Sequence, residues 1–117
     1  MKLLSIAVPC YNSQDYMEHC VESLLPGGED VEILIVDDGS KDQTGVIADR
    51  LASAHPGIVR AIHQENAGHG GAVNTGLKYA TGLFFKVVDS DDWVGLEANE
   101  KILAFLRDAV AGGRLPD

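Results

Sequence analysis

The chain has 117 residues, of which 45% are hydrophobic and 23% are charged, as expected for one globular domain. Its formal net charge of −9 argues against a nucleic-acid partner, because phosphate backbones are bound by clustered Lys and Arg, and the nine basic residues here are scattered. No apolar run approaches the roughly 18 residues of a membrane span, and the two cysteines lack the paired spacing of a metal or redox site.

Apolar runs alternate with helix-period segments four times along the chain, which predicts βα units around a largely parallel sheet. The first strand is expected over residues 3–8. Asn12 or Ser13 is expected to cap the helix that follows, which is predicted to end near Leu25. The apolar positions of this helix form one stripe at helical spacing: Tyr16, Met17, Cys20, Val21, Leu24 and Leu25.

The second strand, residues 31–36, is almost wholly apolar and is therefore expected at the centre of the sheet. Ser40 and Gln43 have the spacing of a capping box, which predicts that Ser40 begins a helix ending near Ala54. The inward face of that helix is predicted to hold Ile47, Leu51 and Ala54.

The second half of the chain is expected to form two more strands and two more helices. Residues 58–63 predict a more polar strand nearer an edge, and the glycine-dense residues 65–72 lead into a helix. A buried strand is predicted over residues 83–88, and a last helix over residues 96–110. The apolar faces of the two helices are predicted to hold Val73, Gly76, Leu77 and Ala80, and Ile102, Leu103, Leu106 and Val110.

Acidic residues follow the last predicted strand: Asp89, Asp91 and Asp92. A strand that ends in acids places negative charge at the carboxyl edge of a sheet, where open α/β sheets bind ligands. Asp89 and Asp91 have the spacing that lets two carboxylates reach one hard cation, directly or through water. The alternative is a solvated acidic turn, with Ser90 and the aspartates supplying turn and cap chemistry.

Every βα loop of a parallel sheet emerges at the same edge, so the loops after the first, second and fourth strands are expected to share one crevice. These residues also have simpler interpretations, because Tyr11 could be a packed aromatic, and Asp37 with Asp38 could form a turn. The residues expected at the crevice are Pro9, Tyr11 and Asn12, then Asp37, Asp38, Gly39 and Ser40, and finally Asp89, Asp91 and Asp92.

The loop from Gly68 to Gly71 also has two interpretations. It could be a tight left-handed connection, or it could let backbone N–H groups at the start of a helix approach a phosphate. It matches neither the phosphate-loop pattern nor the dinucleotide fingerprint. His69, within this loop, is predicted to be a surface or loop-packing histidine rather than a ligand.

Four ordered segments resemble those of family 2 glycosyltransferases. Three of them are IAVPCYN at residues 6–12, ILIVDDGSKD at residues 33–42 and VVDSDDW at residues 87–93, and a middle segment lies within residues 66–82. The resemblance implies a GT-A fold: a Rossmann-like, mostly parallel α/β sheet of about four βα units with helices on both faces. It also implies that residues 1–117 form the nucleotide-sugar-binding half, with the second half absent.

The resemblance assigns roles to the crevice residues. Pro9 and Tyr11 are expected to border the nucleobase, usually uracil, and Asp38 to accept a hydrogen bond from the base edge. Asp91 is expected to coordinate Mn²⁺ or Mg²⁺ bridging two phosphates, with Asp89 near the ribose or sugar; such a cation stabilises charge on the leaving diphosphate. The implied donor-binding set is Pro9, Tyr11, Asn12, Asp37, Asp38, Gly39, Gly68, Asn74, Asp89, Ser90 and Asp91, with Asp91 and Asp89 as metal ligands.

The chain departs from the family pattern in two respects. Val73 lies where many members carry an Arg that meets the diphosphate, and Lys78, Lys86 or His69 could replace it. The general base of inverting members lies far beyond the D-x-D pair, so the base is expected beyond Asp117, together with the acceptor site. The chain by itself is therefore expected to bind the donor without transferring sugar at a useful rate.

The resulting hypothesis is metal-dependent binding of a UDP-sugar for inverting transfer of a hexosyl group to an unidentified acceptor hydroxyl. The expected pathway is cell-surface polysaccharide or glycolipid synthesis. The expected location is the cytoplasm or the cytoplasmic face of a membrane, and any membrane contact is expected to come from regions absent from this chain. Two alternatives are a receiver-like, Mg²⁺-binding signalling domain and a non-catalytic nucleotide-sugar-binding module. Receivers place their paired acids after the first strand, however, whereas this chain places its pairs after the second and fourth.

Overall fold

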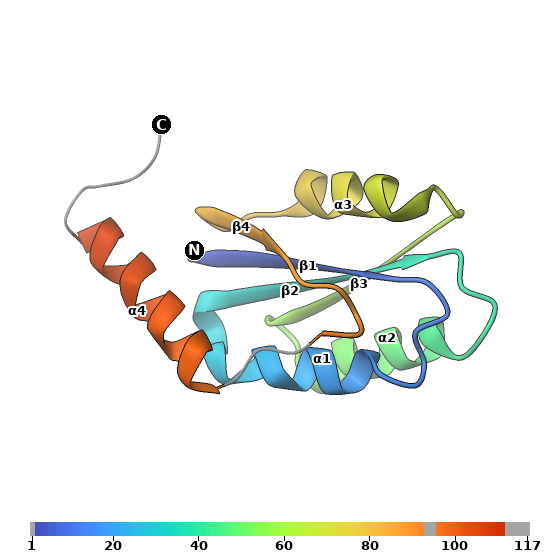
Figure 1. Ribbon diagram of the computed structural model, residues 1–117, viewed down its shortest axis with the longest axis horizontal. Coiled ribbons are helices and arrows are strands. Elements are labelled where there is room, and N and C mark those ends of the chain that lie inside the picture. Colours follow the sequence, from blue (N-terminus) through green and yellow to red (C-terminus); the bar gives the residue numbers. More distant parts are fainter. Residues whose placement is uncertain (1, 93–95, 112–117) are drawn as a thin grey trace.

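The computed structural model describes residues 2–92 and 96–111, which form an α/β sheet structure (Figure 1). Trp93, the last residue of the VVDSDDW segment, lies outside the described residues. None of the described helices is long and apolar enough to cross a membrane. The elements in chain order are β1 (Leu4–Cys10), α1 (Met17–Leu24), the 3-10 helix η1 (Leu25–Asp30), β2 (Val31–Asp38), α2 (Thr44–Ala54), β3 (Val59–Gln64), α3 (Gly68–Tyr79), β4 (Phe84–Val87) and α4 (Leu96–Ala111).

The four strands are all parallel and lie in the order β3-β2-β1-β4. In Figure 1, α3 covers one face of the sheet, whereas α1 and α2 cover the other. Right-handed crossovers explain this division, because the chain moves in one direction along the sheet from β1 to β3 and then returns across it to β4. The predicted fold class is confirmed, and so are the central position of β2 and the edge position of β3.

The core is built around β1 and β2, whose residues are buried along the full length of both strands. Strands covered on both faces need near-continuous apolar runs, which is why these two segments do not alternate in polarity. The predicted stripe of α1 packs on this core through Met17, Cys20, Val21 and Leu24. Tyr16, by contrast, is exposed, because it precedes the first helical turn.

The prediction of a buried fourth strand is wrong. The residues of β4 are only half-buried, and Leu83 before it is exposed. Among the described residues, β4 pairs only with β1, from Leu4↔Phe84 to Ala7↔Val87, so it is an edge strand. The apolar run therefore predicted the strand correctly, but it did not show that the strand would lie at the edge of the sheet.

Both predicted helix caps after β1 and β2 are also wrong. Helix α1 begins at Met17, because Asn12 has a left-handed backbone (φ 48°) and the carbonyl of Ser13 accepts the N–H groups of Tyr16 and Met17 in a preceding turn. Helix α2 begins at Thr44 rather than at Ser40. These start points place both helices further from the strand ends than their capping residues suggested.

The Ser40 hydroxyl accepts a hydrogen bond from the N–H of Asn12 instead of capping α2. Asp42 Oδ1 accepts the N–H of Thr44 at the actual helix start. The later start changes the inward face of α2: Thr44, Ala48 and Leu51 are buried, Ile47 is partly buried, and Ala54 is exposed.

Helix α3 begins at Gly68, inside the predicted loop, and its buried face includes the predicted Gly76 but has Ala72 in place of Val73 and Leu77. Ala72 and Gly76 are buried, whereas Leu77 is 56% exposed. A Cβ on Gly76 would lie 2.6 Å from the Cβ of Ala7 in β1. Glycine is therefore required here for α3 to pack closely on the sheet.

Candidate functional site

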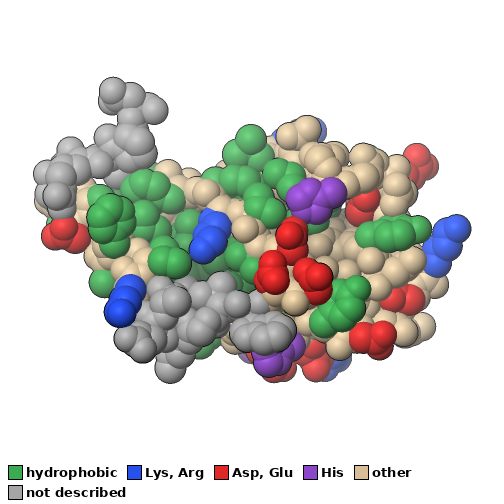
Figure 2. Space-filling model, in the orientation of Figure 1, with side chains coloured by type: hydrophobic (Ala, Val, Ile, Leu, Met, Phe, Trp, Pro, Cys, Tyr) green, Lys and Arg blue, Asp and Glu red, His purple; other side chains and the backbone are tan. Residues whose placement is uncertain are grey.

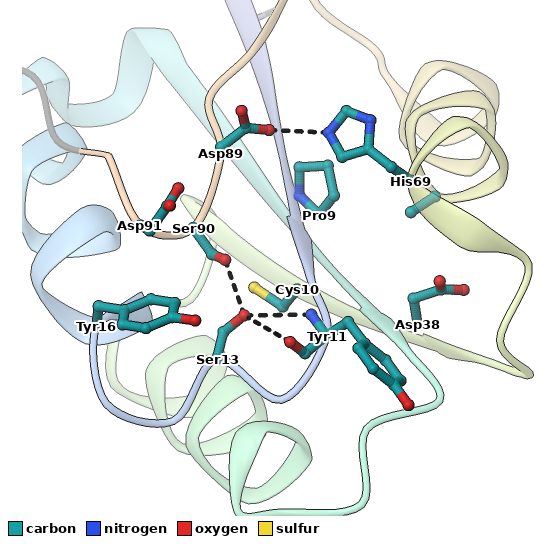
Figure 3. Close-up of a pocket in the computed structure, with 11 residues that line it drawn as sticks. Pro9, Cys10, Tyr11, Ser13, Tyr16, Asp38, His69, Asp89, Ser90 and Asp91 are labelled. Carbon is teal, nitrogen blue, oxygen red and sulfur yellow. Dashed lines mark hydrogen bonds and ion pairs between the residues drawn. The ribbon is translucent and has the colours of Figure 1, made fainter.

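A pocket of about 250 Å³ lies at the carboxyl ends of the strands (Figure 3). The chain's path along the sheet reverses between β1 and β4, and this reversal separates the loops and opens a crevice in parallel α/β sheets. Its walls come from the end of β1 and the loop after it, the end of β2, the first turns of α3 and the segment after β4. The lining residues are Pro9, Cys10, Tyr11, Ser13, Tyr16, Asp38, His69, Ala72, Asp89, Ser90 and Asp91.

The structure thus brings together six of the residues predicted for donor binding: Pro9, Tyr11, Asp38, Asp89, Ser90 and Asp91. Their convergence follows from the parallel sheet, because the loops after β1, β2 and β4 leave the same edge. The roles expected of these residues stay predictions. The other predicted residues do not line this pocket: Asn12, Asp37, Gly39, Gly68 and Asn74.

Three exposed carboxylates form an acidic cluster after β4. Asp89, Asp91 and Asp92 each offer an oxygen atom within 4.8 Å of the others. Figure 2 shows acidic side chains gathered in the middle of this face of the molecule. Carboxylate oxygens are the ligands that Mg²⁺ and other hard divalent cations prefer, so this donor set fits such a cation.

Hydrogen bonds beneath the pocket hold the acidic segment against the loop after β1. Ser90 Oγ lies 2.8 Å from Ser13 Oγ, and the Ser13 N–H donates to Thr44 Oγ1 at 2.8 Å. All three residues are buried. The thiol of Cys20 in α1 donates to the Asp89 carbonyl at 3.5 Å. Ser90 therefore contributes to the site by fixing the backbone that carries the aspartates.

Asp38 is 3% exposed and uses its carboxylate to hold the start of α3. Its Oδ1 accepts from Gln64 Nε2 at 2.9 Å and from the Ala67 N–H at 2.7 Å, and its Oδ2 accepts the Gly68 N–H at 3.0 Å. Negative charge at a helix N-terminus is favourable. A carboxylate has about four acceptor positions, so about one position remains for a ligand in the pocket.

Asp37 is directed away from the pocket. Its Oδ2 lies 2.9 Å from His63 Nδ1, and its Oδ1 accepts the Ser40 N–H at 3.1 Å. His63 Nε2 lies 2.8 Å from Asp49 Oδ1, so the ring links β2, β3 and α2. The hydrogen bond to Asp49, and next the one to Asp37, raise the pKa of His63 above its usual value.

The remaining predicted residues support the loops. Asn12 Oδ1 accepts the Lys41 N–H at 2.9 Å, which connects the loops after β1 and β2. Gly39 has a φ of 74°, and a Cβ there would lie 2.7 Å from the Asn66 nitrogen. Asn74 is exposed on α3. Asn12 and Gly39 thus belong to the loops beside the crevice, and none of these three residues lines the pocket.

His69 lines the pocket with a side chain that is 65% exposed, which agrees with the predicted surface position. Its Nε2 lies 2.8 Å from Asp89 Oδ1 across the pocket (Figure 3). The prediction of a surface or loop histidine assumed that residues 65–72 form a loop, whereas His69 is the second residue of α3. Knowledge of the helix start would have been the signal that places His69 beside the pocket.

Cys10 also lines the pocket without having been predicted. Burial, and next the neighbouring Cys20, raise the pKa of the Cys10 thiol to about 12. A thiol with that pKa remains protonated at neutral pH and is a poor nucleophile. Cys10 therefore forms part of the pocket wall rather than a reactive centre.

Comparisons with known proteins find similar sequences among glycosyltransferases. A family model described as Glycosyl transferase family 2 matches residues 5–116. The uncharacterized glycosyltransferase EpsJ of Bacillus subtilis (strain 168) is 45% identical over 93 residues, which are 79% of this chain and 27% of EpsJ.

Solved glycosyltransferases share the fold. S. aureus TarS 1-349 in complex with UDP-GlcNAc has a TM-score of 0.79 and 33% identity, over 94% of this chain and 32% of that one. Mannosyltransferase PcManGT from Pyrobaculum calidifontis, in complex with GDP-Man and Mn²⁺, has a TM-score of 0.75 and 26% identity, over 86% of this chain and 30% of that one. The chain thus spans no more than a third of the length of each relative.

Proposed function

The chain belongs to glycosyl transferase family 2, and we propose that its pocket binds a UDP-sugar together with a divalent cation. One observation carries the proposal: the same pocket contains Tyr11 and Asp38, which could bind a base, and the carboxylates of Asp89 and Asp91, which could bind a cation. The presence of UDP-GlcNAc in the TarS complex supports the choice of donor.

The base would bind between Pro9, Tyr11 and Asp38. The Tyr11 side chain lines the pocket and is 48% exposed, so its ring is accessible for stacking on a base. The remaining acceptor position of Asp38 suits the ring N–H of uracil. Because Asp38 is already held by three donors, it would offer this position without moving.

Asp91 and Asp89, with Asp92 beside them, would hold the cation. A bound Mn²⁺ or Mg²⁺ would offset the carboxylates and stabilise the charge that develops on a leaving diphosphate. Without a cation, these acids would repel the phosphates of the donor. The Mn²⁺ in the PcManGT complex supports a divalent cation but leaves its identity open for this chain.

We further propose inverting transfer of a hexosyl group to an acceptor hydroxyl, with the general base and the acceptor site supplied by protein outside this chain. The match covers only 27–32% of the length of these relatives, which supports a division between donor and acceptor parts. The product class suggested by the sequence resemblance is a cell-surface polysaccharide or glycolipid. Robust transfer by residues 1–117 alone would contradict the division.

Calorimetric titration of UDP tests donor binding. We expect binding in the presence of Mn²⁺ and much weaker binding in its absence, and we expect Asp91→Ala to remove this difference. Glu22→Ala is the matched control, because Glu22 is an exposed acid of α1 that does not line the pocket. Failure of the folded chain to bind UDP with Mn²⁺ or Mg²⁺ would refute the proposal.

A further inference from the structure

The pocket wall is acidic. Asp38, Asp89 and Asp91 line it, but within residues 2–92 and 96–111 no Lys or Arg does. A nucleoside diphosphate would add further negative charge, so hydrogen-bond donors directed at its phosphates would strengthen binding beyond the contribution of a cation. His69 is the pocket-lining side chain best suited to that task, and the inference developed from it rests on the proposed function.

His69 extends from the first turn of α3 toward the acidic cluster. Its side chain is 65% exposed, and its Nε2 donates to the Asp89 carboxylate, which can only accept. Because so much of the His69 ring is exposed, a phosphate group could approach it from solvent.

The two alternative donors lie elsewhere. Lys78 belongs to the last turn of α3, where its Nζ lies 6.0 Å from the centre of the Tyr79 ring. Lys86 is in β4, paired with Ile6, before the carboxyl end of the strand. Neither lines the pocket. Of the three residues that the sequence left open, only His69 is beside the carboxylates expected to hold the cation.

We propose that His69 binds the donor diphosphate. Its Nε2–H donates a hydrogen bond to Asp89 before binding, and to a phosphate oxygen once cation and donor are bound. A neutral imidazole has one N–H, so it donates to one of these two acceptors at a time. Engagement of Asp89 by the cation would release this N–H for the phosphate.

The test compares UDP with uridine in the presence of Mn²⁺, by calorimetry for UDP and by chemical-shift titration for uridine. His69→Ala is expected to weaken UDP binding about tenfold or more, the usual effect of losing a hydrogen bond to a charged group, and to leave uridine binding within about twofold. His69→Arg is expected to restore UDP binding, because guanidinium N–H groups suit phosphate. Lys78→Ala, which removes a positive charge from the same helix, is expected to change neither affinity.

A second readout separates phosphate binding from a purely positional role. Titration of Mn²⁺ without nucleotide, followed by water-proton relaxation, is expected to show that His69→Ala binds Mn²⁺ at least as tightly as the original chain, because the imidazole no longer competes for Asp89. Equal losses for Mn²⁺ alone, or for uridine and UDP, would show that His69 acts through Asp89 or through pocket shape, and would overturn the proposal. His69→Leu, which also lacks a donor, provides a second variant if thermal unfolding shows that His69→Ala is misfolded.

The outcomes also distinguish this inference from the proposed function. If the original chain fails to bind UDP with a divalent cation, the donor-binding function itself is refuted, and the role of His69 with it. If the original chain binds UDP and His69→Ala binds it equally well, only the role of His69 is refuted.

Discussion

Asp38→Asn is expected to lower the free energy of unfolding by about 1–3 kcal/mol. The Asp38 carboxylate is buried and accepts three hydrogen bonds, two from the backbone at the start of α3 and one from Gln64. An Asn side chain keeps one oxygen but places an NH₂ group against at least one of these donors. A hydrogen bond to a charged group contributes about 1.5–3 kcal/mol, and a donor left unpaired costs about 1–3 kcal/mol.

Urea unfolding followed by circular dichroism measures this loss as a lower midpoint with an unchanged slope. A domain of this size has a typical stability of about 5–15 kcal/mol, so the variant is expected to remain folded at low urea. Asp15→Asn is the matched control, because Asp15 is exposed and lies in the loop before α1, outside the pocket. An Asp38→Asn midpoint equal to that of Asp15→Asn would refute the view that this carboxylate anchors α3.

Two further predictions concern stability. Because its two aspartate partners raise the pKa of His63, protonation of His63 stabilises the folded state; this contribution is present below the unfolded value of 6.5 and is lost as the pH rises through the folded pKa. The stability difference between the original chain and His63→Gln should therefore shrink in urea unfolding as the pH is raised above 6.5. Gly76→Ala should lower the melting temperature, because overpacking against Ala7 costs about 1–3 kcal/mol and outweighs the helix propensity gain of about 1 kcal/mol; an increase would contradict the close packing of α3 on β1.

The sheet could be predicted from the sequence because its signals are local. Continuous apolar runs marked β1 and β2, and acids directly follow the apolar runs that form β2 and β4. The exposure of β4 could not be predicted, because it depends on which strand lies beside it rather than on its own residues. The family assignment also came from local segments, and the match over residues 5–116 confirms it.

The helix starts could not be predicted because contacts distant in the sequence determine them. The Ser40 hydroxyl suited a helix cap, but it bonds to Asn12, which is 28 residues earlier in the chain. In the same way, Asp38 holds the N–H groups of Ala67 and Gly68 and so begins α3 at a glycine that resembled a loop residue. Capping rules weigh only neighbouring residues, so they could not detect these competing partners.

Asp38 connects the two ends of the pocket through the backbone of α3. It lies at the proposed base site, and it fixes Ala67 and Gly68 directly before His69, the proposed contact to the diphosphate. Loss of UDP affinity in Asp38→Asn would therefore have two sources, a missing acceptor for the base and a displaced His69. Uridine senses only the first source, because it carries no phosphate. The ratio of UDP to uridine affinity in this variant thus measures how strongly the start of α3 depends on Asp38, the residue at the proposed base site.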